Sequence, residues 1–146
     1  MKRIEVDSRE PIEIARLVMS YARKAGVTAI RRRVDFDFDY KLVTKNVQVL
    51  IERKQFKDFY NTSVNEKRRK ALYRKLVTAM NSGYDVYLVV TGTQRELLDC
   101  SEYERKLNVV FGSIASVAKL GVPVVVLNEC GWLTFARLLV RFLAQL

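Results

Sequence analysis

The feature that most constrains the fold is the stretch of residues 47–58, VQVLIERKQFKD. Apolar residues recur there at every second position, the period of a β-strand: Val47, Val49 and Ile51. The pattern predicts a buried strand that leads into a turn and a helix. Because side chains alternate along a strand, Glu52 and Lys54 lie on the same face, opposite to the alternating valines and isoleucine. A carboxylate can hold a divalent cation and a neighbouring lysine can orient a water, although this spacing also occurs in solvated surface ion pairs.

Strand and helix patterns alternate along the rest of the chain. Apolar residues at strand spacing or in short runs predict further strands over residues 2–6, 28–43, 86–90 and 122–127. Helical spacing predicts helices over residues 11–26, 63–81, 101–121 and 133–146, with capping boxes at Ser63–Glu66 and Ser101–Glu104. This alternation indicates an α/β fold with a central mixed sheet flanked by helices, in a single domain spanning residues 1–146.

Acidic residues follow or occupy three of the predicted strands. Asp7 ends the first strand, and Asp35, Asp37 and Asp39 alternate with aromatic residues in the second. If residues 28–43 form one strand, these three acids share a face, which would be either an acidic solvent face or part of a site. With Glu52, the strand-end acids converge if their strands are neighbours. Magnesium or manganese would then bind through two or three carboxylates, waters and a phosphate oxygen.

Composition excludes several kinds of site. The chain has no histidine, which removes histidine zinc ligands and Ser-His or Cys-His nucleophile pairs. Its two cysteines, Cys100 and Cys130, lack metal-ligand spacing, and we expect both to be reduced. The first residues lack the apolar run of a signal peptide, and no apolar run reaches the length of a membrane span. We therefore expect an intracellular protein, cytoplasmic or associated with the nucleoid.

Positive charge is concentrated in the first half of the chain. Residues 1–75 contain 20 Lys and Arg against 10 Asp and Glu, whereas residues 76–146 contain 6 against 6. Such density favours a phosphate backbone as partner over a merely solvated surface. The candidate DNA-binding residues are Arg31, Arg33, Lys57, Lys67, Arg68 and Lys75.

The last predicted helix is apolar over more than half of its circumference. A helix that covers only one face of a sheet needs a narrower apolar stripe. Either this helix is buried on both sides, or its excess apolar surface contacts another subunit, and we favour a dimer. The candidate interface residues are Phe135, Leu138, Leu139, Phe142 and Leu146.

Several of these motifs together resemble one family. Residues 52–58, Glu-Arg-Lys-Gln-Phe-Lys-Asp, fit the pattern Glu-Arg-Lys-x-x-x-Asp of the XPF/Hef structure-specific endonucleases, which are similar to PD-(D/E)XK enzymes. Val-Asp-Ser-Arg-Glu at residues 6–10 is similar to that family's opening strand and turn, and residues 39–40 match its Asp-Tyr. The order of the later helices and strands is also similar, so the resemblance covers nearly the whole chain. It implies a restriction-endonuclease-like fold.

The resemblance also implies an activity: magnesium- or manganese-assisted hydrolysis of a phosphodiester in flaps, forks or junctions of DNA. Asp39 and Glu52 would bind the metal, with Asp7 as a third ligand, direct or through water. Lys54 would polarise the attacking water or stabilise charge on the phosphate. The residues that would orient these groups are Arg9, Glu10, Arg53 and Asp58. A homodimer or heterodimer through the last helix is implied too, and delivery to DNA by a clamp or helicase stays open.

The chain departs from the family's pattern in two ways. Phe38 stands where the family has glycine before the metal-binding aspartate, which leaves open whether Asp37 or Asp39 is the ligand. The helix-hairpin-helix DNA-binding module that usually accompanies such domains is absent, so we expect a free-standing nuclease domain. Two alternatives remain. One is a catalytically silent subunit that holds DNA beside an active nuclease, and the other is a Holliday-junction resolvase, which would not share Asp58 or the Gly-Val-Pro strand.

Overall fold

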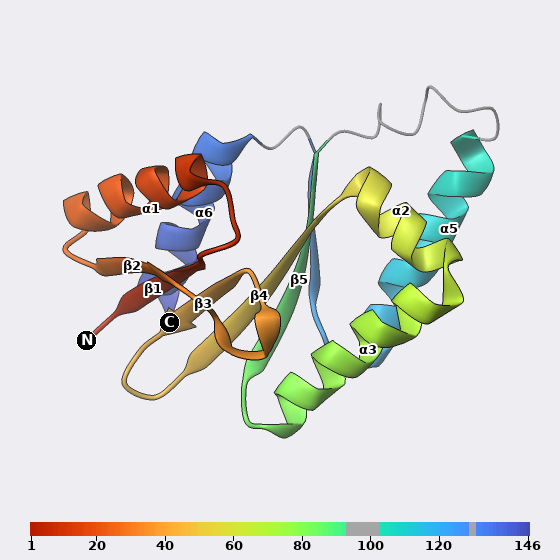
Figure 1. The fold of residues 1–146 in the computed structure, drawn as a ribbon, viewed down its shortest axis with the longest axis horizontal. Helices are drawn as coiled ribbons and strands as arrows, with labels where there is room; N and C mark the ends of the chain where they lie inside the picture. Colours follow the sequence, from red (N-terminus) through yellow and green to blue (C-terminus); the bar gives the residue numbers. More distant parts are fainter. Residues whose placement is uncertain (93–102, 129–130) are drawn as a thin grey trace. The chain divides into compact units, whose positions relative to one another are not determined.

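The computed structural model describes residues 1–92, 103–128 and 131–146. The chain divides into two compact units. The first unit contains residues 1–52 and 131–146, and the second contains residues 53–130. Figure 1 shows the helices and strands of both units.

The first unit is built on a mixed sheet. Its strands are β1 (Arg3–Asp7), β2 (Thr28–Arg32), β3 (Tyr40–Val43) and β4 (Gln48–Gln55), the last of which continues into the second unit. β1 pairs in parallel with β2 and antiparallel with β3, and β3 pairs antiparallel with β4. The predicted hairpin between β3 and β4 is confirmed, and Thr44 N–H closes it by donating to Val47 O at 2.9 Å. Parallel and antiparallel pairs in one sheet with packed helices confirm the predicted α/β class.

Two helices from opposite ends of the sequence pack together on this sheet. They are α1 (Ile12–Lys24) and α6 (Trp132–Gln145), which lie side by side in Figure 1. Phe135 of α6 lies against Tyr40 of β3 with ring centroids 5.1 Å apart, and both side chains are fully buried. Lys2 Nζ donates to the carbonyls of Leu143 and Ala144 in the last turn of α6. These contacts anchor the C-terminal helix to the strands that carry the candidate acids.

The second unit combines a parallel strand pair with three helices. Its elements after β4 are α2 (Phe56–Val64), α3 (Glu66–Asn81), β5 (Asp85–Gly92), α5 (Tyr103–Lys119) and β6 (Val124–Asn128). β5 and β6 are parallel, and α2 packs against both α3 and α5. Among the described residues, no helix has the length and apolar character needed to cross a bilayer.

The helix starts differ from the sequence prediction. The capping box at Ser63–Glu66 is wrong, because α2 continues through Val64 and Ser63 Oγ donates to Phe59 O at 2.7 Å. Asn65 caps α3 instead, and its side chain accepts from Arg68 N at 3.0 Å. The capping box at Ser101–Glu104 begins outside the described residues.

Burial varies among the elements of the second unit. Phe111 of α5 is 50% exposed, whereas Val110, Ser113 and Val117 of the same helix are buried. β6 is only partly covered, since Val126 is 43% exposed. By contrast, β5 is covered over most of its length.

Candidate active site

Asp7 ends β1 and is almost completely buried, with 1% of its surface exposed. Its carboxylate accepts four hydrogen bonds. Oδ1 accepts from Arg9 N at 2.9 Å and Arg9 Nε at 2.8 Å, and Oδ2 accepts from Val34 N at 2.9 Å and Arg9 Nη2 at 3.3 Å. A carboxylate offers about four lone-pair positions, so these four bonds use all of the hydrogen-bond acceptor capacity of Asp7.

The burial and bonding of Asp7 affect its pKa in opposite directions. Burial would raise the pKa, but the hydrogen bonds from Arg9 and Val34 outweigh it and lower the pKa from 3.8 to about 2. The pKa of Arg9 is raised, first by its hydrogen bond to Asp7 and also by the charges of Asp37 and Asp39. Arg9 therefore lies in the field of three carboxylates and binds Asp7 across the turn that follows β1.

Asp39 joins β1 to β4 through its main chain. Its carbonyl accepts from Asp7 N at 2.9 Å, and its own N–H donates to Ile51 O at 3.2 Å. Tyr40 also pairs with Ile51, so two residues here face one on β4, the arrangement of a β-bulge. Bulges often re-aim a side chain beside a functional site. These two main-chain hydrogen bonds join Asp39 to Asp7 on β1 and to Ile51 on β4. Because Glu52 directly follows Ile51, Asp39 is tied to the main chain at or next to both other candidate acids.

The predicted ladder of acids on one strand face is wrong. β2 ends at Arg32, and residues Asp35–Asp37 form a 3₁₀ turn, η1, before β3 begins at Tyr40. Asp37 lies in this turn, 64% of its side chain is exposed, and its Oδ1 accepts from Arg33 Nη2 at 2.7 Å. Asp37 thus lies in η1, whereas Asp39 lies between η1 and β3, where its main chain is bonded to both β1 and β4.

Glu52 and Lys54 lie two residues apart in β4, as predicted. Glu52 is 7% exposed and Lys54 is half-buried. The alternation of a strand gives both side chains the same face, while Arg53 takes the other and donates to Thr91 Oγ1 of β5 at 3.5 Å. Asp58 is exposed in the first turn of α2.

Sequence reasoning missed three residues that organise this region. Tyr40 donates from its hydroxyl to Glu10 Oε2 at 2.6 Å, and Val34 N–H donates to Asp7. Lys41 is only 9% exposed and donates to Asp35 Oδ2. The place of Lys41, opposite Glu5 in the pairing of β1 with β3, could have identified it as a buried partner for an acid.

Carboxylate oxygens such as those of the candidate acids are ligands that a small hard cation prefers. Among the described residues, no group of three or more metal-ligating side chains gathers. Mg²⁺ commonly binds through one or two carboxylates and keeps several waters. Asp39 and Glu52 could supply those carboxylates, whereas four hydrogen bonds already occupy Asp7.

The candidate DNA-binding residues divide into two groups. Arg31 donates to the carbonyls of Ser8 and Glu10 at 2.7 and 3.0 Å, and Arg33 pairs with Asp37. These two arginines therefore support the turns around Asp7 and Asp37. The others lie on helices of the second unit: Lys57 on α2 and Lys67, Arg68 and Lys75 on α3, all exposed except the half-buried Lys75.

Much of the apolar surface predicted for a dimer lies inside the chain. Phe135 and Leu139 are each 1% exposed, packed within the first unit. Leu138 and Phe142 are half-buried. Leu146 is 38% exposed, and these last three leave some apolar surface on α6 for a partner.

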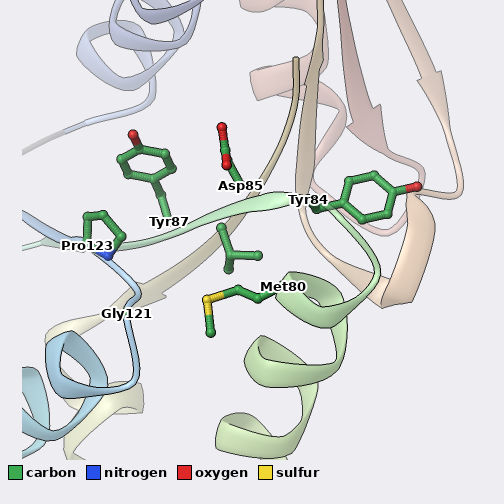
Figure 2. Close-up of a pocket in the computed structure, with 7 residues that line it drawn as sticks. Met80, Tyr84, Asp85, Tyr87, Gly121 and Pro123 are labelled. Carbon is green, nitrogen blue, oxygen red and sulfur yellow. The ribbon is translucent and has the colours of Figure 1, made fainter. Parts of the chain in front are cut away.

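A cavity of about 330 Å³ lies in the second unit, near the start of β5. Figure 2 shows Asp85 and Tyr87 projecting on one side of this strand and Met80 on the other. The remaining lining residues are Tyr84, Val86, Gly121 and Pro123. Asp85 is the single carboxylate of this lining, and none of the candidate catalytic residues belongs to it.

Comparison with known proteins identifies similar folds. No protein-family model matches the sequence, and no curated protein matches it. Among solved structures, XPF from Aeropyrum pernix in complex with DNA matches with a TM-score of 0.67 and 23% identity, over 99% of this chain and 64% of that one. A second structure of XPF from Aeropyrum pernix matches with a TM-score of 0.64 and 21% identity, over 98% of this chain and 60% of that one. The chain thus spans less than two thirds of the length of these proteins and shares their fold, which confirms the predicted fold class.

Proposed function

We propose that this chain is a DNA nuclease domain that hydrolyses a phosphodiester with the help of magnesium or manganese. The observation that carries the proposal is the main-chain bonding of Asp39, to Asp7 on one side and to Ile51, next to Glu52, on the other. The Glu-Arg-Lys-x-x-x-Asp pattern falls on the same strand end and the helix that follows it. The fold shared with XPF, which was solved in complex with DNA, supports the same reading.

Each candidate residue has a role in this proposal that follows from its contacts. Asp39 and Glu52 hold the cation, which when bound polarises the phosphate and lowers the pKa of a water. Asp7 acts as a positioning residue, because its carboxylate is committed to Arg9 and Val34. Lys54 faces the same side of β4 as Glu52, where its ammonium can orient the attacking water or offset charge on the phosphate.

The substrate we propose is branched or discontinuous DNA, such as flaps, forks and junctions. This substrate class rests on the resemblance to the XPF/Hef enzymes. Exposed cations on α3 suit contacts to the phosphate backbone, which position DNA without reading its bases.

The test is a cleavage panel of duplex, flap, fork and four-way junction, with and without Mg²⁺. We expect cutting of at least one branched DNA, only with the metal. Glu52→Gln and Lys54→Met should each reduce cutting by at least about 100-fold, since electrostatic groups at reacting centres contribute on this scale. DNA binding should change much less than cutting, because the other contacts to the phosphate backbone remain.

The matched controls carry the same chemical changes at exposed positions away from the site. They are Glu13→Gln on α1 and Lys45→Met in the β3–β4 hairpin. Both should cut like the wild type. Unchanged cutting by the Glu52 or Lys54 variant would contradict the assigned roles.

One observation favours the silent-subunit alternative. The described residues hold no group of three metal-ligating side chains, and the hydrogen bonds of Asp7 are saturated. A silent subunit would bind the branched DNAs but cut none of them with either Mg²⁺ or Mn²⁺. The cleavage panel therefore separates the two functions when binding is measured on the same DNAs.

A further inference from the structure

The turn η1, directly before β3, contains two residues in an unfavourable backbone conformation. Phe36 has φ 56° and ψ 22°, and Asp37 has φ 59°. A left-handed conformation is uncommon for residues other than glycine, and for a bulky side chain such as phenylalanine it is an outlier. Such conformations persist only where surrounding contacts determine them, and they cluster at functional sites.

Ion pairs hold this turn at both ends. Lys41 of β3 pairs with Asp35, and Asp37 Oδ1 lies 2.7 Å from Arg33 Nη2 and 3.6 Å from Arg9 Nη2. Arg9 also binds Asp7, so the turn is linked directly to a candidate site residue. These contacts explain why the turn keeps its conformation, although none of them requires an aromatic side chain at position 36.

The two phenylalanines of this segment face different environments. Phe38 is completely buried, whereas Phe36 is 40% exposed. Val34, on the other side of the turn, donates its N–H to Asp7, and Asp39 follows Phe38. The partly exposed ring of Phe36 is therefore held at a turn whose two ends lie beside the candidate acids.

Partly exposed cations lie near this turn. Arg33 and Arg9 both approach Asp37, the residue after Phe36, and their side chains are 58% and 46% exposed. Arg32, at the end of β2, is 59% exposed. Proteins that bind single-stranded nucleic acid combine aromatic side chains, on which unpaired bases stack, with a positively charged surface.

We infer that Phe36 stacks on an unpaired DNA base next to the phosphate that is cut. The inference rests on the proposed function. It assigns a role in substrate preference to Phe36, which is not among the residues that carry the resemblance to the XPF/Hef enzymes. In intact duplex DNA both faces of each base are covered by neighbours, so stacking on Phe36 requires a base freed at a gap, flap or fork. The turn would thus favour discontinuous DNA without reading its sequence.

The experiment compares binding of two DNAs by fluorescence anisotropy, with Ca²⁺ in place of Mg²⁺ to prevent cutting. One is an intact duplex, and the other is the same duplex with a short flap of unpaired bases. Phe36→Ala should weaken flap binding by about 5- to 100-fold, the range measured for loss of one stacked base, and change duplex binding by less than about two-fold. Phe36→Leu should lose as much, because it keeps apolar volume without a ring, and Phe36→Trp should bind flaps like the wild type.

Folding is controlled by Phe36→Gly, which removes the ring and relieves the left-handed strain. It should melt at a higher temperature than the wild type and still lose the preference for flaps. Equal affinity of Phe36→Ala and wild type for the flap, or equal losses on flap and duplex, would overturn the stacking role while leaving the nuclease proposal intact. A wild-type protein that bound neither DNA would overturn the proposed function itself.

Discussion

Replacing Asp7 with asparagine tests the physical basis of the site, independently of catalysis. The pKa of Asp7 is lowered from 3.8 to about 2, and each unit corresponds to about 1.4 kcal/mol, so ionised Asp7 contributes about 2 kcal/mol of stability at neutral pH. The substituted side chain would also turn its amide N–H₂ toward the N–H donors of Val34 or Arg9, and an unpaired buried donor costs about 1–3 kcal/mol. The two effects together should lower the free energy of unfolding of Asp7→Asn by about 3–5 kcal/mol at pH 7.

The difference in unfolding free energy between the wild type and Asp7→Asn should change with pH in a definite direction. A carboxyl whose folded pKa is depressed stabilises the protein above its unfolded pKa, and that contribution is lost as pH falls through the folded pKa. For Asp7 the loss begins near pH 4 and continues through pH 2. With these two pKa values, about half of the contribution remains at pH 3. The gap between wild type and Asp7→Asn should therefore narrow by about 1 kcal/mol between pH 7 and pH 3.

Urea unfolding followed by circular dichroism at pH 7, 4 and 3 measures this gap directly. Comparing the two proteins at each pH cancels the contributions that they share, so the change in the gap reports on Asp7. Asp85→Asn provides the control, because Asp85 is exposed in β5 and its replacement should cost less than about 0.5 kcal/mol. A gap that stays constant from pH 7 to pH 3 would refute the assignment of a depressed pKa to Asp7.

Two further predictions concern partners. Changing both Lys67 and Arg68 of α3 to glutamate should weaken DNA binding. The slope of log affinity against log salt concentration should fall by about 2, because two phosphate contacts are lost. An unchanged slope in a salt titration would exclude α3 from the DNA interface. If the exposed and half-buried apolar residues of α6, Leu133, Leu138 and Leu146, contact a second copy, light scattering at micromolar concentration should give twice the 16.9 kDa chain mass. A mass of one chain would remove the dimer.

The strand that carries Glu52 could be predicted because its pattern has one interpretation. Alternating apolar residues followed by a polar strand end match β4, and the helix after it begins at Phe56. The order of strands and helices could be predicted for the same reason, since long periodic segments determine their own structure. The helix starts were harder, because Ser63 and Asn65 both suit a cap. In the structure Ser63 lies inside α2 and Asn65 caps α3.

The segment between β2 and β3 could not be predicted from its pattern. Residues 35–40 alternate acid and aromatic, as a half-buried strand would. Contacts outside the alternating pattern override that local preference: Val34 donates to Asp7 of β1, and Lys41 of β3 pairs with Asp35. The pattern also gave no sign that Asp7 would accept four hydrogen bonds, since one of them depends on where the chain returns at Val34.

Phe38 stands at the position where the XPF/Hef pattern has glycine, and its conformation shows how this segment accommodates a phenylalanine. Phe38 has φ −72° and ψ 165°, an extended conformation that any residue adopts, so the backbone here does not require glycine. Its side chain is completely buried in the first unit, where a phenylalanine contributes about 1.5–3 kcal/mol of apolar burial. The strained conformations fall instead on Phe36 and Asp37, each of which costs about 1–3 kcal/mol. Burial of Phe38 can thus offset part of the strain in a turn that leaves Phe36 partly exposed beside the candidate acids.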